Sequence, residues 1–354
     1  MILDFKINAN LAFDCVETAL SSYLSWNKIK WEYMFIGSWG FSFNSFIGPL
    51  TEKSIDPLMG NVRLPLFVYG GIKIVRKKNS IEKAMQFIKY ELENNRPVLL
   101  ETDIYYCAWS TQYKQYKSAH ILTIIGINDD GNIICLDNGA YAKFKGPVIM
   151  SKEDFVSGYR SFLILKNHNK RKEIKWTNLI IESILCMKYK IHPDFIYYLK
   201  IFKLSYRMIY NILILAKKFK LQTSFDNIRM LADTIEKVYY KKNDLNFIED
   251  TDLYSNKLYK RIGKVATGRK KYYITLDFLA KEYNIKPLYE ISKRLNELSH
   301  MWEEVKFYFF ECVKNEDIES LKKASEKLKK ISYDEELIAK ELYDVAISAI
   351  YPNS

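Results

Sequence analysis

The N-terminal part of the chain contains the stretch DCVETALSSYLSW at residues 14–26, which sets where the first helix begins. Asp14 followed three residues later by Glu17 is the capping-box pattern, in which each side chain bonds the other residue's main-chain N–H. Cys15 therefore falls in the first helical turn, where the positive end of the helix dipole favours a thiolate. Apolar residues then recur at helical spacing, as Val16, Ala19, Leu20, Tyr23 and Leu24.

Two further chemically capable side chains border the strands of an expected hairpin. His120 opens an apolar run that ends at Gly126, and Asp137 closes the next run after a turn at residues 129–132. Adjacent antiparallel strands can place an imidazole beside a carboxylate, which then holds the imidazole tautomer and stabilises the imidazolium. Cys15, His120 and Asp137 are thus a candidate catalytic triad in the chain order of papain-like enzymes.

Ordinary structural roles are also open to these residue types: a small buried hydrophobe for the cysteine, a satisfied core group for the histidine and a turn residue for the aspartate. Cys107 and Cys135 are poorer nucleophiles, because one lies in an aromatic segment without a helix cap and the other lies in mid-strand. The main-chain N–H of Cys15 is one donor for an oxyanion. Asn8 and Asn10 are candidates for the second donor.

Glycine and charge divide the 354-residue chain near residue 170. Eleven of the 13 glycines lie before residue 160, and the net charge of +12 separates into +3 over residues 1–169 and +9 over residues 170–354. The first part alternates helix and strand patterns, and the second shows long helical patterns with almost no glycine or proline. The sequence predicts an α+β domain with an antiparallel sheet at 1–169 and an all-helical domain at 170–354. The expected helices of the second domain are 194–220, 224–242, 275–284, 288–312, 315–331 and 334–350.

Several classes of protein are disfavoured by the composition. The first 14 residues carry charges and no apolar core of a signal peptide, and Lys200, Lys203 and Arg207 interrupt the apolar stretch 195–219, so we expect a cytoplasmic protein without a membrane span. Five cysteines without a CxxC pair and four scattered histidines predict neither a disulfide framework nor a metal site. The lysines are spread among acidic residues, which argues against nucleic acid as a partner.

At this point the sequence resembles a known family, the N-terminal domain of butirosin biosynthesis protein H, over roughly residues 8–166. The segments that carry the resemblance are Cys15 with Glu17–Leu20, Tyr33–Phe41, Pro97-Val98, Asp103–Tyr106, Ala119-His120 and Leu136-Asp137. The resemblance implies a papain-like cysteine hydrolase or transferase fold with a helical C-terminal extension. It also implies acyl transfer from a carrier-protein phosphopantetheine thioester to an amine, with no bound cofactor. Closthioamide-type amide synthetases are a specific candidate within it.

The resemblance gives the remaining residues expected roles. An aromatic slot for the acyl group is expected from Tyr33, Phe35, Trp39, Phe41, Phe43, Tyr105, Tyr106 and Trp109, for which plain core packing is the alternative. Asp103 is either an anchor for the amine cation or a strand-end carboxylate. The basic surface suits an acidic carrier protein as partner. Two other functions are open: a cysteine peptidase or thioesterase with the same triad and water as acceptor, and a non-catalytic helical binding protein.

Overall fold

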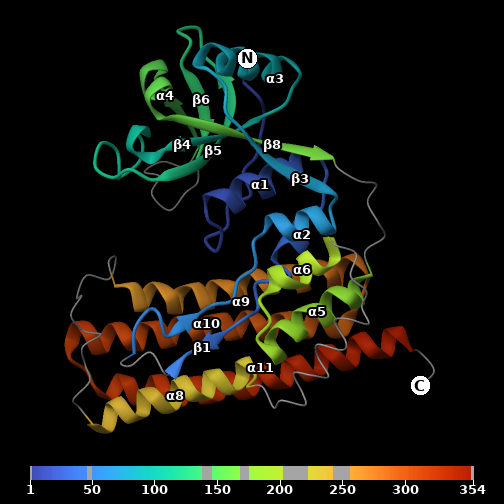
Figure 1. The fold of residues 1–354 in the computed structure, drawn as a ribbon, viewed down its shortest axis with the longest axis vertical. Coiled ribbons are helices and arrows are strands. Elements are labelled where there is room, and N and C mark those ends of the chain that lie inside the picture. Colours follow the sequence, from blue (N-terminus) through green and yellow to red (C-terminus); the bar gives the residue numbers. More distant parts are fainter. Residues whose placement is uncertain are drawn as a thin grey trace. The chain divides into compact units, whose positions relative to one another are not determined.

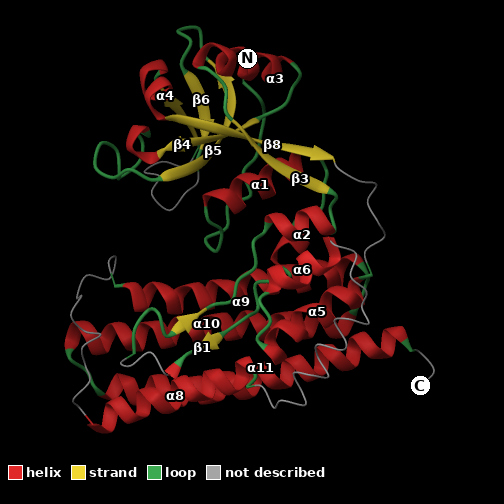
Figure 2. Cartoon of the chain, viewed as in Figure 1, coloured by secondary structure: helices red, strands yellow, loops and turns green. Residues whose placement is uncertain are grey.

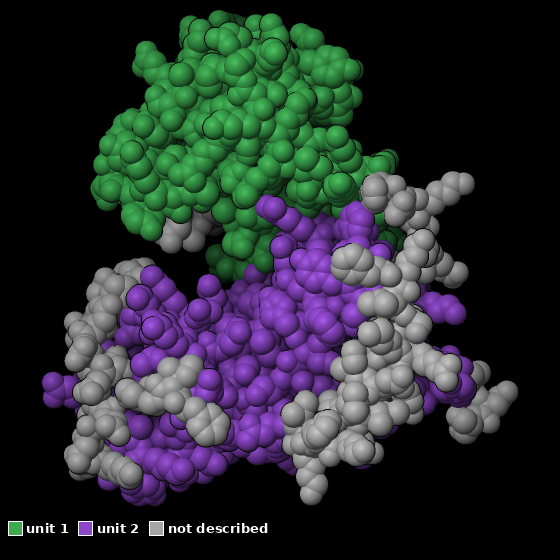
Figure 3. Space-filling model, viewed as in Figure 1, with its two compact units in different colours: residues 1–31, 69–171 green, residues 32–68, 172–354 purple. Residues whose placement is uncertain are grey.

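The computed structural model describes residues 2–45, 50–137, 146–167, 175–201, 222–241 and 256–351. Its chain divides into two compact units, shown in different colours in Figure 3. Unit 1 comprises residues 1–31 and 69–171, and unit 2 comprises residues 32–68 and 172–354. A division near residue 170 was expected, but the sequence prediction assigned residues 32–68 to the first domain. The structure groups them with the helical unit.

Unit 1 is built on a six-stranded antiparallel sheet, drawn in yellow in Figure 2. The strand order is β3-β8-β4-β5-β6-β7. The strands are β3 (Ile72–Lys77), β4 (Val98–Asp103), β5 (Ala119–Ile127), β6 (Ile133–Leu136), β7 (Pro147–Met150) and β8 (Tyr159–Asn167). Gly131 has a φ of +79° in the turn that joins β5 to β6, which explains why a glycine stands there. The expected hairpin and the α+β class are confirmed.

Three α-helices accompany the sheet, and they are α1 (Cys15–Trp26), α3 (Ile81–Glu93) and α4 (Lys152–Gly158). Each begins after a residue of a type that favours helix starts: Asp14, Ser80 and Ser151. Ser151 accepts a hydrogen bond from the main-chain N–H of Asp154, whereas the side chain of Ser80 makes no cap bond to α3. Ala84, Ile88 and Leu92 of α3 are buried in the apolar core that the strands supply from β4, β5, β6 and β8.

Unit 2 is mainly helical, and Figure 1 shows its long helices in yellow, orange and red. Residues 32–68 contribute η1 (Glu32–Phe35), β1 (Ser42–Phe43), β2 (Ile55–Asp56) and α2 (Arg63–Val68). The later helices are α5 (Trp176–Tyr189), α6 (Pro193–Ile201), α8 (Ser224–Lys241), α9 (Lys257–Glu282), α10 (Lys286–Asn315) and α11 (Glu319–Ile350). Helix α10 packs against both α9 and α11, and α11 also packs against α8 and α5.

Four of the expected helices differ in extent from those observed. The prediction at 194–220 begins as α6, and residues 202–220 of it lie outside the described residues. The prediction at 275–284 is only the end of α9, which is 26 residues long. The two helices expected at 315–331 and 334–350 are one continuous α11. Ser332 sits in mid-helix without breaking it, because its hydroxyl donates to the main-chain oxygen of Phe225.

A buried ion pair ties residues 37–41 to the helices of unit 2. Arg269 of α9 and Glu335 of α11 are both fully buried, and the guanidinium Nε and Nη2 atoms lie 2.8 and 2.9 Å from the two carboxylate oxygens. The remaining Nη1 donates to the main-chain oxygen of Gly40 at 2.7 Å, and the indole N–H groups of Trp39 and Trp302 donate to the same carboxylate. These contacts explain why residues 32–68 fold with unit 2.

Candidate active site

The first turn of α1 presents the thiol of Cys15. Asp14 accepts a hydrogen bond from the N–H of Glu17 at 2.9 Å, and the Glu17 carboxylate accepts one from the N–H of Asp14 at 2.9 Å. Both bonds of the predicted capping box are therefore present. The cap starts the helix at Cys15, and the side chain of this residue is partly exposed.

The β5–β6 hairpin brings His120 to Asp137. Thr123 pairs with Leu136, the last residue of β6. Because the strands are antiparallel, the next residue, Asp137, falls opposite Leu122. His120 is then the diagonal neighbour of Asp137 on the same face of the sheet. The two side chains meet through His120 Nε2 and Asp137 Oδ2, which are 2.8 Å apart, and both residues are 5% exposed.

The imidazole of His120 also hydrogen-bonds the side chain of Cys15. Burial alone lowers the pKa of His120, but the hydrogen bonds and charges of Asp137 and Cys15 outweigh it and raise this pKa from 6.5 to about 10. The site therefore favours the imidazolium form of His120 next to Cys15.

Trp109 is a further member of this cluster. Its indole Nε1 donates to Oδ2 of Asp137 at 2.8 Å, which is the same oxygen that bonds His120, and the side chain is buried. The sequence analysis expected Trp109 to line an apolar slot. A tryptophan in this position indicates a buried ring. Nothing in the neighbouring sequence indicates that its N–H bonds the carboxylate of Asp137.

The other four cysteines are buried, in contrast to Cys15. Burial raises the pKa of Cys107 and Cys135, and the nearby carboxylate of Asp137 raises it further. Burial likewise raises the pKa of Cys186, and that of Cys312 to about 11. Their thiols are held in the unreactive protonated form, so Cys15 is the nucleophile that this structure offers.

The two asparagine candidates for the oxyanion site lie in different surroundings. Asn8 donates from its side chain to Ser25, ten residues beyond Cys15 on α1, or roughly 15 Å along the helix axis. This placement is a correction, because it holds the amide of Asn8 away from the thiol. Asn10 shapes the turn just before the helix, where its side-chain oxygen accepts from the N–H of Ala12 at 2.9 Å.

The expected aromatic slot is corrected by the structure. Tyr33, Trp39 and Phe41 are at most 4% exposed and lie in unit 2, whereas the triad lies in unit 1. Trp39 stacks on Tyr272 with ring centroids 5.0 Å apart, and Phe41 packs on Trp302 at 5.5 Å. Phe35 and Phe43 are buried in the same unit. Core packing, the alternative reading, accounts for these rings.

Asp103 ends β4, where it pairs with Ala119 next to His120, and Tyr105 and Tyr106 follow it in the chain. All three have structural partners. Asp103 forms an ion pair with Arg160 at 2.6 Å, and despite partial burial this pair and two main-chain N–H donors lower the pKa of its carboxyl group. These contacts fit the strand-end carboxylate, one of the two roles given for Asp103 in the sequence analysis. The two tyrosine rings are half-buried and flank the ammonium group of Lys114, at 5.1 and 4.4 Å.

A narrow recess begins at Cys15 and runs between α1, β5 and the end of β6. It encloses about 230 Å³, counting the part open to solvent. Its lining is mostly apolar and includes Ala19, Leu122 and Leu136.

Among the described residues, no group of three or more His, Cys, Asp or Glu side chains could hold a metal ion. Within the same ranges, no helix combines the length and the apolar character that a membrane crossing requires.

The site is a buried acid–histidine pair beside a partly exposed cysteine at a helix start, an arrangement also found in enzymes that use a cysteine nucleophile. Residues 14–138 match the family described as butirosin biosynthesis protein H, N-terminal. The matched segment contains Cys15, His120 and Asp137, and this part of the chain is similar to that family, as the sequence analysis predicts. It suggests an acyltransferase-like protein of biosynthesis. No curated protein matches the chain.

Proposed function

We propose that the protein is an amide-forming N-acyltransferase of natural-product biosynthesis. In this proposal Cys15 takes an acyl group from a carrier-protein phosphopantetheine thioester and passes it to an amine. The observation that carries the proposal is the contact of His120 with both Cys15 and Asp137, within a segment similar to butirosin biosynthesis protein H. The papain-like fold, the cytoplasmic location and the acidic carrier protein as partner belong to this proposal.

The chemistry proceeds in two half-reactions. The Cys15 thiolate attacks the thioester carbonyl, the carbon–sulfur bond to pantetheine breaks, and His120 gives its proton to the departing thiol. The amine then attacks the acyl-cysteine carbonyl, His120 accepts a proton from the amine nitrogen, and the Cys15 thiolate leaves. Asp137 holds the imidazole in register and stabilises its charge in both steps. Aminolysis of a thioester runs downhill, so that no other co-reactant is needed.

The helix start supports the proposal by offering a donor to the oxyanion. Among the described residues, the main-chain N–H of Cys15 has no hydrogen-bond acceptor, as expected for the first residue of a helix. In this proposal it donates to the carbonyl oxygen of a substrate on Sγ as that oxygen gains negative charge. The amide of Asn10 is the second donor in this proposal, since the turn that it forms ends directly before Asp14.

The test uses an acyl-carrier protein with and without an amine, followed by intact-protein mass spectrometry. We expect an acyl adduct on the wild-type chain and its conversion to an amide when the amine is added. Cys15→Ala should form no adduct, while Cys312→Ala, which removes a buried thiol of unit 2, should form it normally.

The outcome also separates the proposal from its alternatives. Release of free acid at the same rate with and without amine would make the protein a thioesterase or peptidase-like hydrolase. Absence of any adduct on Cys15 would overturn the catalytic proposal and leave a binding function.

A further inference from the structure

The chain between β4 and β5, residues 104–118, is tied together where it leaves and re-enters the sheet. The Oδ1 atom of Asp103 accepts hydrogen bonds from the N–H groups of Tyr105 at 3.2 Å and Ser118 at 3.0 Å. Its Oδ2 atom accepts one from Arg160 of β8 at 2.6 Å. In addition, the N–H of Ile104 donates to the main-chain oxygen of Ser118. Asp103 therefore closes this connection at its base.

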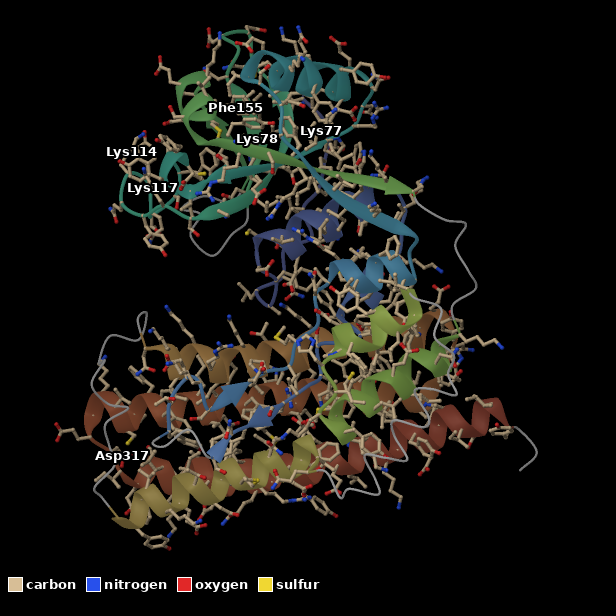
Figure 4. All side chains as sticks on the ribbon, viewed as in Figure 1. Lys77, Lys78, Lys114, Lys117, Phe155 and Asp317 are labelled. Carbon is tan, nitrogen blue, oxygen red and sulfur yellow. The ribbon has the colours of Figure 1, made fainter. Side chains whose placement is uncertain are left out.

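The interior of the connection is also fixed. The N–H of Lys114 donates to the main-chain oxygen of Tyr105 at 3.0 Å, and its ammonium group lies over the ring of Tyr106 at 4.4 Å. Lys117 places its ammonium group over the Tyr105 ring at 5.4 Å, and Figure 4 labels both lysines. Cation–π contacts of this kind stabilise a fold only modestly, but several in one short segment restrict its conformations.

This fixed segment delivers Trp109 to the carboxylate of Asp137. The indole N–H donates to Oδ2 at 2.8 Å, and His120 Nε2 lies 2.8 Å from the same oxygen. All three residues are 5% exposed or less, so water competes little for these bonds. A carboxylate with two donors on one oxygen has little freedom to turn about its Cβ–Cγ bond.

We propose that Trp109 is a positioning residue of the candidate triad, and that the Asp103–Arg160 pair fixes the segment that carries it. The role rests on the proposed function, because it concerns the same three residues. Without the indole N–H the carboxylate turns away from His120. The imidazole then loses part of the interaction that keeps it protonated and aligned with Cys15.

The sharpest test replaces Trp109 by 3-benzothienylalanine, whose bicyclic ring keeps the shape of indole but has sulfur in place of N–H. We expect kcat to fall about 10- to 100-fold with little change in KM. A decrease of this size corresponds to the loss of one hydrogen bond to a charged group. The alkaline limb of the pH–rate profile should move to lower pH. The melting temperature should change little, since the packing is retained. Trp109→Phe should show the same kinetic effect together with some loss of stability.

Trp39→Phe is the matched control, because it also removes a buried indole N–H that bonds a carboxylate, but in unit 2. It should lower the melting temperature without moving the pH limb. Wild-type kcat and an unmoved limb for the benzothienyl variant would overturn the proposal and leave Trp109 as a packing residue.

The same comparison can be made without a substrate, from the pH dependence of Cys15 alkylation by iodoacetamide. The alkylation rate reports the thiolate beside His120 even if no acyl adduct forms, so that failure of the proposed function and failure of this inference give different results. Because iodoacetamide reacts with the thiolate, Arg160→Ala should move the acidic limb of the alkylation profile to higher pH. Arg96→Ala, which breaks the comparable pair with Glu91 elsewhere in unit 1, should not. An unmoved limb in Arg160→Ala would overturn the role given to the Asp103–Arg160 pair.

Discussion

His120 and Asp137 are 17 residues apart in the chain and meet through Nε2 and Oδ2 at 2.8 Å, inside unit 1. Both lie on one hairpin, so the strand register that forms the sheet also forms the acid–histidine pair. The third partner, Cys15, comes from the start of a separate helix. The reactivity of the thiol therefore depends on how α1 packs against β5.

Activity should be lost at high pH rather than near neutrality. The pKa of His120 is about 10 in the folded chain against 6.5 for an ordinary histidine, because the effects of Asp137 and Cys15 outweigh that of burial. The folded state thus binds more protons between these values, so the stabilisation is complete below pH 6.5 and is lost as the pH rises toward 10. Nuclear magnetic resonance titration of the His120 ring measures this directly.

Asp137→Asn removes the charge that keeps His120 protonated. We expect a decrease in kcat on the order of 10²–10⁴-fold and an alkaline limb moved to lower pH. His300→Gln, in α10 of unit 2, is the control and should leave both unchanged. An alkaline limb that stays in place in Asp137→Asn would contradict the assignment of Asp137 as the partner of His120.

Iodoacetamide should alkylate one cysteine in the native protein, Cys15. The other four thiols are buried, and burial raises the pKa of each. Mass spectrometry of the intact chain should show one added group, and peptide mapping should place it on Cys15. Cys15→Ala should show none until the chain is unfolded, when four groups should be added. Labelling of a buried cysteine at a comparable native rate would contradict the prediction.

The helix cap next to the nucleophile should matter for both stability and rate. Asp14→Ala removes the side chain that bonds the N–H of Glu17, at a cost of about 1 kcal/mol in the free energy of unfolding. Because the fraying turn contains Cys15, we also expect a lower kcat. Asp14→Ser retains a capping oxygen and should recover most of both losses. Equal kinetic defects in the alanine and serine variants would show that the cap does not hold the thiol.

Replacing each of the two glycines of α9 by alanine should change the stability of unit 2 in opposite directions. A Cβ atom at Gly263 meets only the Lys306 side chain, at 3.4 Å, so that Gly263→Ala should stabilise the helix by about 0.5–1 kcal/mol. A Cβ atom at Gly268 would lie 2.5 Å from the main-chain oxygen of Ser38. Gly268→Ala should therefore destabilise unit 2 by about 1–3 kcal/mol, as overpacking does. The free energy of unfolding of both variants is measured by urea denaturation. A stabilised Gly268→Ala would contradict the close packing of residues 37–41 on α9.

The buried ion pair of unit 2 should be sensitive to loss of one partner. Arg269→Met leaves the Glu335 carboxylate buried without its cation and should cost about 3–5 kcal/mol. Arg229→Met is the matched control, because Arg229 is exposed, and its loss should cost less than about 1 kcal/mol. Replacing both partners, Arg269→Met with Glu335→Leu, should cost less than the sum of the single changes. Strict additivity in urea unfolding would mean that the two side chains act independently.

Local signals made much of unit 1 predictable. The capping box located the start of α1, and the Asp-Asp-Gly-Asn turn located the hairpin that pairs His120 with Asp137. Both signals act over a few residues, where hydrogen bonds and turn geometry follow directly from residue type. The helical character of residues beyond 175 was equally readable, because apolar periodicity needs no knowledge of the partner.

The roles of the aromatic residues were not predictable in this way. Trp39 bonds Glu335 across 296 positions, and Gly40 accepts from Arg269 across 229, so that residues 32–68 fold with helices far along the chain. Asn8 and Asp103 likewise have partners, Ser25 and Arg160, that no spacing rule indicates. A buried ring or amide carries the same sequence signal whether it lines a substrate site or packs in a core.

The sequence by itself determined the nucleophile's place at a helix start and the pairing of His120 with Asp137, because each depends on contacts within one helix turn or one hairpin. Only the tertiary structure decided that these elements converge on one another, that Trp109 bonds the carboxylate, and that the aromatic segment 33–43 belongs to unit 2. Those contacts join residues distant in the chain, and they form because burial of apolar surface selects one packing among the many that the same local pattern allows.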